Sequence, residues 1–183
     1  MLDNNAFVIV TGLPASGKTT LARALAAHLA LPLIDKDVIL ESLYDSLGMG
    51  DHPWRHSLSR AADDILFALA AEAGRAVLVN WWHRDTAPTR LHQLEAHLIE
   101  VHLIEVHCDC PTPLVAERFR TRTRHPGHLD QTLTEDHLQE CLTTWSSHPG
   151  PLGRLFRILS AESAASGAVP GRAVGAFAYW AYV

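Results

Sequence analysis

Short apolar runs alternate along the chain with longer segments in which apolar residues recur every three or four positions. The first run, AFVIV at residues 6–10, is rich in β-branched residues and ends near Gly12, which is typical of a strand buried on both faces. Runs of the same kind recur along the chain, with different lengths between them. The pattern therefore predicts five strands, at residues 6–10, 31–34, 76–80, 100–108 and 154–159.

The segments between these runs have the periodicity of amphipathic helices. Between residues 18 and 31 the apolar residues keep helical spacing, and Pro32 cannot continue a helix. A longer apolar face, closed by Gly74, predicts a helix from Trp54 to Ala73. The other predicted helices cover residues 37–48, 88–97, 111–122 and 134–146.

Strands that alternate with helices in one domain predict a parallel sheet covered on both faces, because parallel neighbours need crossover connections. We therefore expect an α/β fold in three layers around a five-stranded parallel sheet. A chain of 183 residues suits one such domain, which we place at residues 1–160. The tail, 161–183, mixes small residues with an aromatic end and fits either a docked or a partly disordered segment.

Composition and charge narrow the range of partners. Apolar residues make up 48% of the chain and charged residues 19%, which is ordinary for a folded globular protein. The net charge of −5 provides no general positive field for a polyanion such as duplex DNA. Any contact with nucleic acid would therefore have to be local.

The cysteines bear on compartment and metal binding. Cys108, Cys110 and Cys141 are an odd number in a chain without a signal-peptide pattern, which favours free thiols and a cytoplasmic location. The stretch HCDC at 107–110 alternates between the faces of a predicted strand, so we do not expect it to hold a metal. The longest apolar run is shorter than the roughly 20 residues of a membrane span, and no membrane contact is expected.

The stretch GLPASGKT at residues 12–19 satisfies the phosphate-binding pattern GxxxxGK(S/T) between a predicted strand and a predicted helix. Gly12 and Gly17 let the backbone turn its N–H groups inward at a helix N-terminus, where they form an anion site. Lys18 should reach the β and γ phosphates of a nucleotide, and Thr19 should ligate Mg²⁺. The predicted nucleotide-binding residues here are Gly12, Leu13, Pro14, Ala15, Ser16, Gly17, Lys18, Thr19 and Thr20.

A carboxylate is expected beside this phosphate site. Asp37 follows the second predicted strand, at the edge of the sheet where parallel α/β folds bind ligands. It is placed to accept a proton from an acceptor hydroxyl during phosphoryl transfer. The alternative is that Asp37 or Asp35 caps the following helix, and Asp35 fits either a cap or a contact with Mg²⁺-bound water.

Four arginines, Arg118, Arg120, Arg122 and Arg124, run from a predicted helix into a Pro/Gly-containing stretch. Guanidinium groups suit the oxygens of a transferring phosphoryl group, and Arg118 and Arg122 share one helical face. A solvated basic stretch is the alternative. Because the run follows the fourth strand, we expect an Arg-rich lid at about residues 120–134, with catalytic roles for Arg122 and Arg124 beside Lys18 and Asp37.

The stretches GLPASGKTTLA, IDKDVILESLYDSLG and VAERFRTRTRHPGH together resemble the small P-loop kinases of the predicted AAA-type group. This group is related to chloramphenicol phosphotransferase, zeta-toxin-like kinases, gluconate kinase and polynucleotide 5′-kinase. The resemblance covers about Ala6 to Leu159 and implies a nucleoside-monophosphate-kinase-like sheet with a central P-loop strand. It implies that Asp37 activates or orients the acceptor hydroxyl. It also implies that the lid arginines Arg118, Arg122 and Arg124 hold ATP, with Arg118 or Arg122 near the adenine.

One position departs from this resemblance. Relatives often carry an acidic residue at the end of the third strand, where this chain has Asn80. A neutral amide orients Mg²⁺-bound water only weakly, so metal binding would depend mainly on Thr19 and the phosphates.

Aromatic and basic residues follow Asn80 at the same edge. Trp81 and Trp82 are interpreted as packing residues, with a stacking platform for a flat acceptor as the alternative. The neighbouring pair His83 and Arg84 belongs to the same stretch. By resemblance alone, the acceptor region also includes Arg55, His56 and Arg60.

These observations predict an ATP- and Mg²⁺-dependent kinase that phosphorylates a hydroxyl of a small molecule of the antibiotic, sugar or nucleotide-sugar class. The guanine-reading motif of a switch GTPase does not occur where it should. A polynucleotide 5′-hydroxyl kinase is an alternative, which the local arginines and tryptophans favour and the acidic balance disfavours. A nucleotide-dependent binding or regulatory module with little turnover is the other alternative, and Asn80 is its best support.

Overall fold

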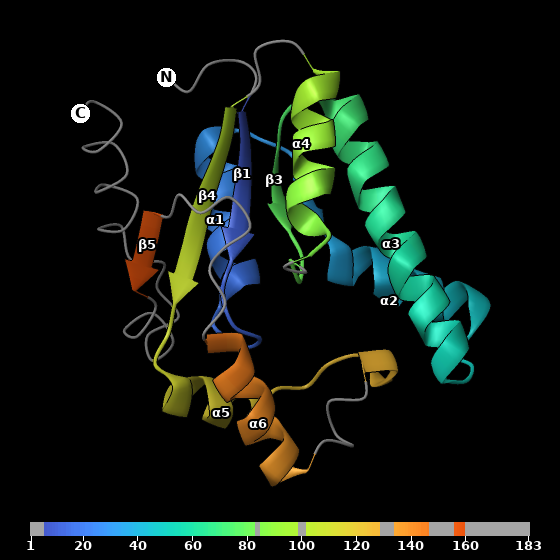
Figure 1. The fold of residues 1–183 in the computed structure, drawn as a ribbon, viewed down its shortest axis with the longest axis vertical. Helices are drawn as coiled ribbons and strands as arrows, with labels where there is room; N and C mark the ends of the chain where they lie inside the picture. Colours follow the sequence, from blue (N-terminus) through green and yellow to red (C-terminus); the bar gives the residue numbers. More distant parts are fainter. Residues whose placement is uncertain (1–5, 83–84, 99–101, 129–133, 147–155, 160–183) are drawn as a thin grey trace.

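The computed structural model describes residues 6–82, 85–98, 102–128, 134–146 and 156–159. Helices surround one parallel sheet (Figure 1). The strands are β1 (Ala6–Thr11), β2 (Leu33–Asp35), β3 (Ala76–Val79), β4 (His102–Asp109) and β5 (Phe156–Leu159). The helices are α1 (Lys18–Leu29), α2 (Lys36–Leu47), α3 (His52–Ala73), α4 (Ala87–His97), α5 (Thr112–Thr121), the 3₁₀ turn η1 (Pro126–His128) and α6 (Glu135–Ser146).

The sheet has the order β2-β3-β1-β4-β5, and each neighbouring pair is parallel. In register, Val10 of β1 lies opposite Val79 of β3 on one side and Val106 of β4 on the other. All residues of β1 are buried. The prediction of an α/β fold around a parallel sheet is therefore confirmed, and the strand that leads into the phosphate-binding stretch is central.

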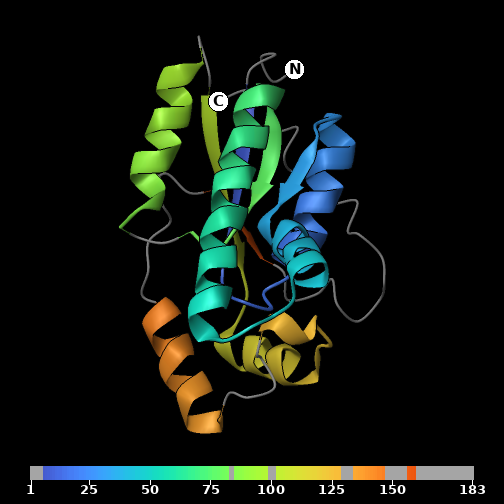
Figure 2. The ribbon, with the colours of Figure 1, turned by 90° about the vertical axis from the view of Figure 1, so that its right-hand side faces the viewer.

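The two faces of β1 are covered by different helices because successive side chains of a strand point to opposite sides. Figure 2 shows the sheet between α1 on one side and α3 with α4 on the other. One core cluster contains Phe7 and Ile9 with Leu66 and Leu91, and the other contains Val8, Val10, Ala22 and Leu25. This arrangement gives the three layers expected from the alternating pattern.

Helices α5 and α6 lie beyond the carboxyl ends of the strands (Figures 1 and 2). Their core, which includes Phe119 and Leu142, also packs against Leu13 and Ala15 of the loop after β1. The phosphate-binding loop is therefore supported by packing against α5 and α6, in addition to its own turn geometry.

Most element boundaries agree with the sequence prediction to within two residues, because they follow from local periodicity, caps and prolines. Helix α2 starts at Lys36 because Asp35 is its N-cap. The tail 161–183 and residues 129–133 of the predicted lid lie outside the described residues. Among the helices that the structure describes, none is long and apolar enough to cross a membrane.

Candidate active site

The loop between β1 and α1 has the backbone conformation of an anion cradle. Gly12 and Gly17 have φ values of 135° and 102°, and Ala15 adopts a φ of 62°. A Cβ at Gly12 would lie 2.6 Å from the Cys108 carbonyl oxygen, so the chain passes too close to β4 for a side chain. Gly17 is the N-cap of α1 without a side-chain hydrogen bond. The first N–H groups of α1 therefore suit an anionic ligand.

Lys18 carries a positive charge into this cradle. Its Nζ donates to the carbonyl oxygens of Gly12, at 3.0 Å, and Leu13, at 2.7 Å. Burial lowers the pKa of the amine to about 8, and the neighbouring Cys108 and Asp37 side chains oppose that effect. Within the described part of the chain, no carboxylate pairs with Lys18. A buried ammonium whose hydrogen bonds to the described residues go to carbonyl oxygens fits the negative charge of a phosphate.

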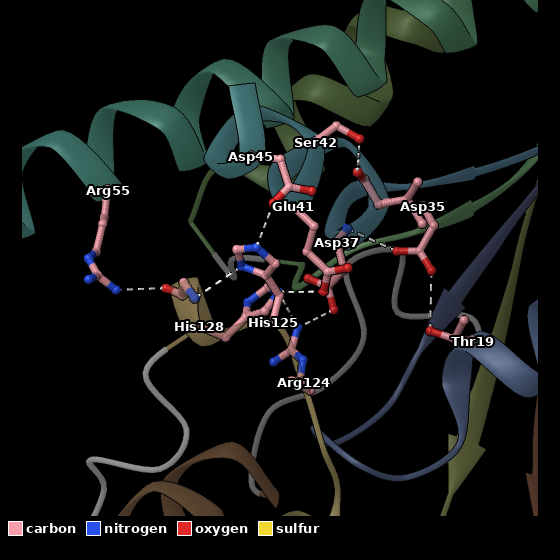
Figure 3. A network of polar contacts seen from close by, with 12 residues as sticks. Thr19, Asp35, Asp37, Glu41, Ser42, Asp45, Arg55, Arg124, His125 and His128 are labelled. Atoms are coloured by element: carbon pink, nitrogen blue, oxygen red, sulfur yellow. Dashed lines mark hydrogen bonds and ion pairs between the residues drawn. The ribbon is translucent and has the colours of Figure 1, made fainter. Parts of the chain in front are cut away.

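Thr19 and Asp35 bring two oxygen ligands together beside the cradle. The Thr19 hydroxyl donates to Asp35 Oδ2 at 3.2 Å, while Asp35 Oδ1 accepts from the Asp37 N–H at 3.0 Å and caps α2 (Figure 3). Burial raises the pKa of Asp35, and the Asp37 N–H opposes that rise. Asp35 is therefore a helix cap whose second oxygen faces Thr19. These oxygens are of the kind that Mg²⁺ prefers.

A metal ion here would depend on other oxygens as well. The residues that the structure describes contain no group of three or more His, Cys, Asp or Glu side chains that could hold a metal. Phosphate oxygens and water would therefore have to complete the coordination of Mg²⁺, as they do in many nucleotide sites. The donor set fits a magnesium ion that arrives with a nucleotide.

A cavity of about 570 Å³ joins the cradle to the start of α2 and the end of α5. The predicted residues that line it are Pro14, Ala15, Gly17, Lys18, Thr19, Thr20, Asp37, Arg118, Arg122 and Arg124. Three predicted residues do not line the cavity, namely Gly12, Leu13 and Ser16. They instead shape the loop and support it from its buried side. The residues that sequence reasoning did not assign to it are Lys36, Leu40, Ser59, Val79, Phe119 and His128.

The arginine run divides between the cavity and the surface. Arg118 Nη1 lies 3.5 Å from the Ser16 carbonyl oxygen, and its buried Nη2 has no hydrogen-bond partner among the described residues. The Arg122 guanidinium lies 4.2 Å from the centre of the Phe119 ring. Arg120 instead pairs with Glu135 of α6 on the exposed side. Only part of the basic run therefore suits phosphate binding.

Arg124 and Asp37 form an ion pair, with 2.5 Å between Nη2 and Oδ2. Figure 3 shows the guanidinium between this carboxylate and the His128 ring, whose Nε2 is 3.1 Å away. His128 Nε2 also lies 2.8 Å from Glu41 Oε1 of α2. The sequence analysis gave Arg124 and Asp37 separate roles, whereas the structure shows them in direct contact.

The 122–128 segment, which follows α5, crosses the cavity edge and docks on α2 and α3. His125 Nε2 lies 3.1 Å from Asp45 Oδ1, and its ring stacks on Tyr44 with centroids 5.6 Å apart. The Arg55 guanidinium donates to the Gly127 carbonyl oxygen at 3.0 Å (Figure 3). Arg55 thus holds this segment and does not line the cavity.

The other acceptor residues named by resemblance lie elsewhere. His56 and Arg60 are exposed on α3, and neither is among the lining residues of the cavity. Placing them in the acceptor region was therefore wrong for this structure. Both residues face outward because the buried stripe of α3 consists of Leu58, Ala62, Leu66 and Ala70.

The two tryptophans have different environments. Trp82 donates from Nε1 to the Val10 carbonyl oxygen at 2.9 Å and packs edge-on against Phe67. It is a core residue, so the platform interpretation is wrong for Trp82. Trp81 lines the cavity, where that interpretation still applies. His83 and Arg84 lie outside the described residues.

Sequence reasoning missed a buried polar cluster at the cavity wall. Lys36 Nζ lies 2.8 Å from Asp63 Oδ2 and donates to Ser59 Oγ at 3.1 Å. Asn80 Nδ2 donates to the other oxygen of Asp63 at 2.8 Å. The available signal was a lysine between two aspartates at a strand end. Its partners Ser59 and Asp63, however, come from α3, and Asn80, which contacts Asp63, follows β3; the sequence does not bring these residues together.

The comparisons with known proteins agree with this geometry. The family model described as an AAA domain, AAA_33, matches residues 7–145. The chain belongs to this family. Membership of this P-loop kinase family implies the use of ATP, typically with Mg²⁺. The finer resemblance to chloramphenicol phosphotransferase, zeta-toxin-like kinases and polynucleotide 5′-kinase stays a prediction.

Individual similar proteins include other kinases. Mouse adenylate kinase 8 is 33% identical over 93 residues, which are 50% of this chain and 19% of that protein. The match thus spans about a fifth of the relative. A crystal structure of a candidate kinase from Chloroflexus aurantiacus is 28% identical, with a TM-score of 0.77 over 97% of this chain and 98% of that one. Shikimate kinase from Bacteroides thetaiotaomicron, at 18% identity and a TM-score of 0.54, covers 83% of this chain and 86% of its own and shares the fold.

Proposed function

We propose that this AAA_33 protein is an ATP- and Mg²⁺-dependent kinase that transfers a phosphoryl group to a hydroxyl of a small molecule. One observation carries the proposal. A single cavity contains the Lys18 ammonium, which has no carboxylate partner among the described residues, and the half-exposed Asp37 carboxylate, which pairs with Arg124. The first group suits the phosphates of a nucleotide, and the second suits the proton of an acceptor. The relatives named as kinases support a phosphotransferase of this kind.

Each residue has a distinct part in this reaction. Lys18 and the first N–H groups of α1 bind and orient phosphate oxygens, while Thr19 and Asp35 would hold Mg²⁺. Bound Mg-ATP supplies the phosphoryl group and the charge of the metal. Asp37 orients the acceptor hydroxyl and takes its proton on a carboxylate oxygen. The arginines at the cavity edge stabilise the negative charge that develops on the transferring group.

The decisive experiment follows label from γ-³²P-ATP with Mg²⁺ to a panel of small hydroxyl compounds and to a 5′-hydroxyl oligonucleotide. We expect label on a small molecule. Asp37→Asn should lower kcat by roughly 10²- to 10⁴-fold and change ATP affinity far less, because it removes the proton acceptor and leaves the hydrogen bonds of Lys18 in place. Asp64→Asn is the matched control, since Asp64 is an exposed aspartate paired with Arg90 on the outer surface.

The alternatives are outcomes of the same experiment. Label that passes only to the oligonucleotide would favour a polynucleotide 5′-kinase. Binding of ATP without transfer to any acceptor would favour the binding or regulatory module. Full activity of Asp37→Asn would remove the carboxylate from the mechanism.

A further inference from the structure

The part of the cavity beyond the cradle is defined here as the acceptor wall, formed by Lys36, Asp37, Ser59, Asn80, Trp81 and Arg124. Each cation in this wall already has an anion against it. Lys36 pairs with Asp63 at 2.8 Å, and Arg124 pairs with Asp37 at 2.5 Å. The acceptor wall therefore has no net charge from these pairs, in contrast to Lys18 in the cradle.

The Lys36–Asp63 pair is arranged with its anion behind the wall. The Lys36 side chain is 6% exposed and lines the cavity, while Asp63 is not among the lining residues. Both oxygens of Asp63 are engaged, one by Lys36 and the other by Asn80. Lys36 has three ammonium hydrogens. Among the described residues, Asp63 and Ser59 accept two of them, which leaves a third for a ligand in the cavity that Lys36 lines.

Hydrogen-bond acceptors stand beside these donors. Asn80 Oδ1 is buried and has no hydrogen-bond partner within the described residues, so a ligand donor would satisfy it. The Ser59 hydroxyl and the Asp37 carboxylate supply further acceptor oxygens. Mixed donors and acceptors at one wall match groups that both donate and accept, as hydroxyls do.

His128 and Glu41, at the edge of the wall, add no positive charge to it. Burial and the neighbouring Arg124 lower the pKa of His128, so this imidazole is neutral at pH 7, and Glu41 lies 2.8 Å from it. A carboxylate or phosphate on the acceptor would have to be desolvated against paired charges and this acidic residue. The wall thus disfavours anionic acceptors. Trp81 also lines this space, and an indole side chain suits the C–H face of a ring compound.

We propose that the acceptor is an uncharged polyhydroxylated molecule, of the sugar or cyclitol class, whose hydroxyls bind Lys36, Ser59 and Asn80 beside Asp37. The inference rests on the proposed kinase function and narrows its substrate class. It predicts that sugar acids and nucleoside monophosphates are poor acceptors, although the site holds several cations.

Matched acceptor pairs test this inference. Release of ADP is measured with three pairs of a neutral and an acidic compound, which are D-glucose with D-gluconate, D-galactose with D-galactonate, and myo-inositol with D-glucuronate. AMP is tested separately as a nucleotide acceptor. We expect the neutral member to give a kcat/KM at least about tenfold higher in each pair that reacts, because one unpaired buried charge costs at least that factor. A preference for the acid or for AMP would leave the protein a kinase and overturn the inference.

Binding is measured in parallel by thermal shift with a non-hydrolysable ATP analogue present. If neutral compounds raise the melting temperature but cause no release of ADP, the kinase function is contradicted. The assignment of the acceptor wall as a binding site for neutral compounds would still hold. If no neutral compound either binds or reacts, the inference is wrong.

Paired substitutions test the residues themselves. Lys36→Met alone leaves Asp63 buried without its cation, so the charge-neutral variant Lys36→Met/Asp63→Asn is compared with wild type. We expect the KM for the neutral acceptor to rise about tenfold or more, with the KM for ATP unchanged. The matched control, Arg90→Met/Asp64→Asn, removes an ion pair of 2.9 Å between α4 and α3 and should change neither KM. An unchanged acceptor KM in the Lys36→Met/Asp63→Asn variant would overturn the role of the pair.

Discussion

The fold sets the pKa of the Lys18 amine by burying it. Burial makes the charged form costly, and the pKa falls to about 8 although Cys108 and Asp37 oppose the shift. The amine is therefore mostly protonated at pH 7 and mostly neutral well above pH 8. Because only the ammonium attracts phosphate, nucleotide affinity should depend on pH in this range.

The sign of that dependence follows from which form binds. ATP binds the protonated amine and keeps it protonated, so apparent affinity is nearly constant below pH 8 and falls as pH rises through the pKa. We expect the Kd for ATP to increase about tenfold between pH 7 and pH 9, as isothermal titration calorimetry would measure. Lys18→Arg is the control, because a guanidinium does not titrate there and its binding, though weaker, should stay flat. The same slope in Lys18→Arg would assign the titration to another group.

At this scale the sequence predicted residues whose chemistry depends on near neighbours in the chain. Gly12, Gly17, Lys18 and Thr19 belong to one contiguous pattern, and the structure brings them together around one loop. The Lys36–Asp63 pair joins residues 27 positions apart, and its burial depends on how α3 packs beside α2. Periodicity along one element carries no information about such a pair.

The 122–128 segment is held as a unit by contacts with two helices. Its backbone passes so close to α2 that a Cβ at Gly127 would lie 2.2 Å from the Tyr44 ring. The stacking of His125 on Tyr44 and the hydrogen bond from Arg55 close the same interface. This docking also places Arg124 against Asp37, so the element links the acceptor wall to the arginine run.

Gly127→Ala should undock this segment without unfolding the domain. Overpacking of this kind costs about 1–3 kcal/mol, which should speed tryptic cleavage after Arg124 by roughly 5- to 150-fold. The melting temperature should also fall, by roughly 2–12 °C for a domain of this size, because the docked segment is part of the folded state. Gly74→Ala is the contrasting control, because Gly74 caps α3 at a φ of 68° with nothing within 4 Å of the added Cβ. It should likewise lower the melting temperature but leave this cleavage nearly unchanged, and equal cleavage rates in the two variants would contradict the docking.

Element by element, the sequence predicted those features that local patterning determines. Helices α1 and α3 follow from apolar spacing ended by Pro32 and Gly74, and β1 from one continuous apolar run. The path of the 122–128 segment could not be predicted, because it depends on contacts such as His125 with Asp45, 80 positions away. The sequence of such a polar segment does not show whether its side chains face solvent or a neighbouring helix.

At the scale of the molecule, the sheet order brings the functional elements to one edge. With β1 central and β3 and β4 in register on either side, the loop before α1, the cap of α2 and the end of α5 surround one cavity. These elements are separated in sequence and are joined only through the folded core. A ligand that contacts several of them should therefore stabilise the whole domain.

Thermal unfolding with and without nucleotide measures that stabilisation. A ligand at 100 times its Kd adds about 2.7 kcal/mol to the free energy of unfolding, which for a domain of this size raises the melting temperature by roughly 5–11 °C. We expect this shift with Mg²⁺ and a non-hydrolysable ATP analogue. Removal of Mg²⁺ with EDTA should reduce it, because the negative charges of Asp35 and the phosphates are then uncompensated. Lys18→Met should nearly abolish it, and an undiminished shift in that variant would place nucleotide binding outside the cradle.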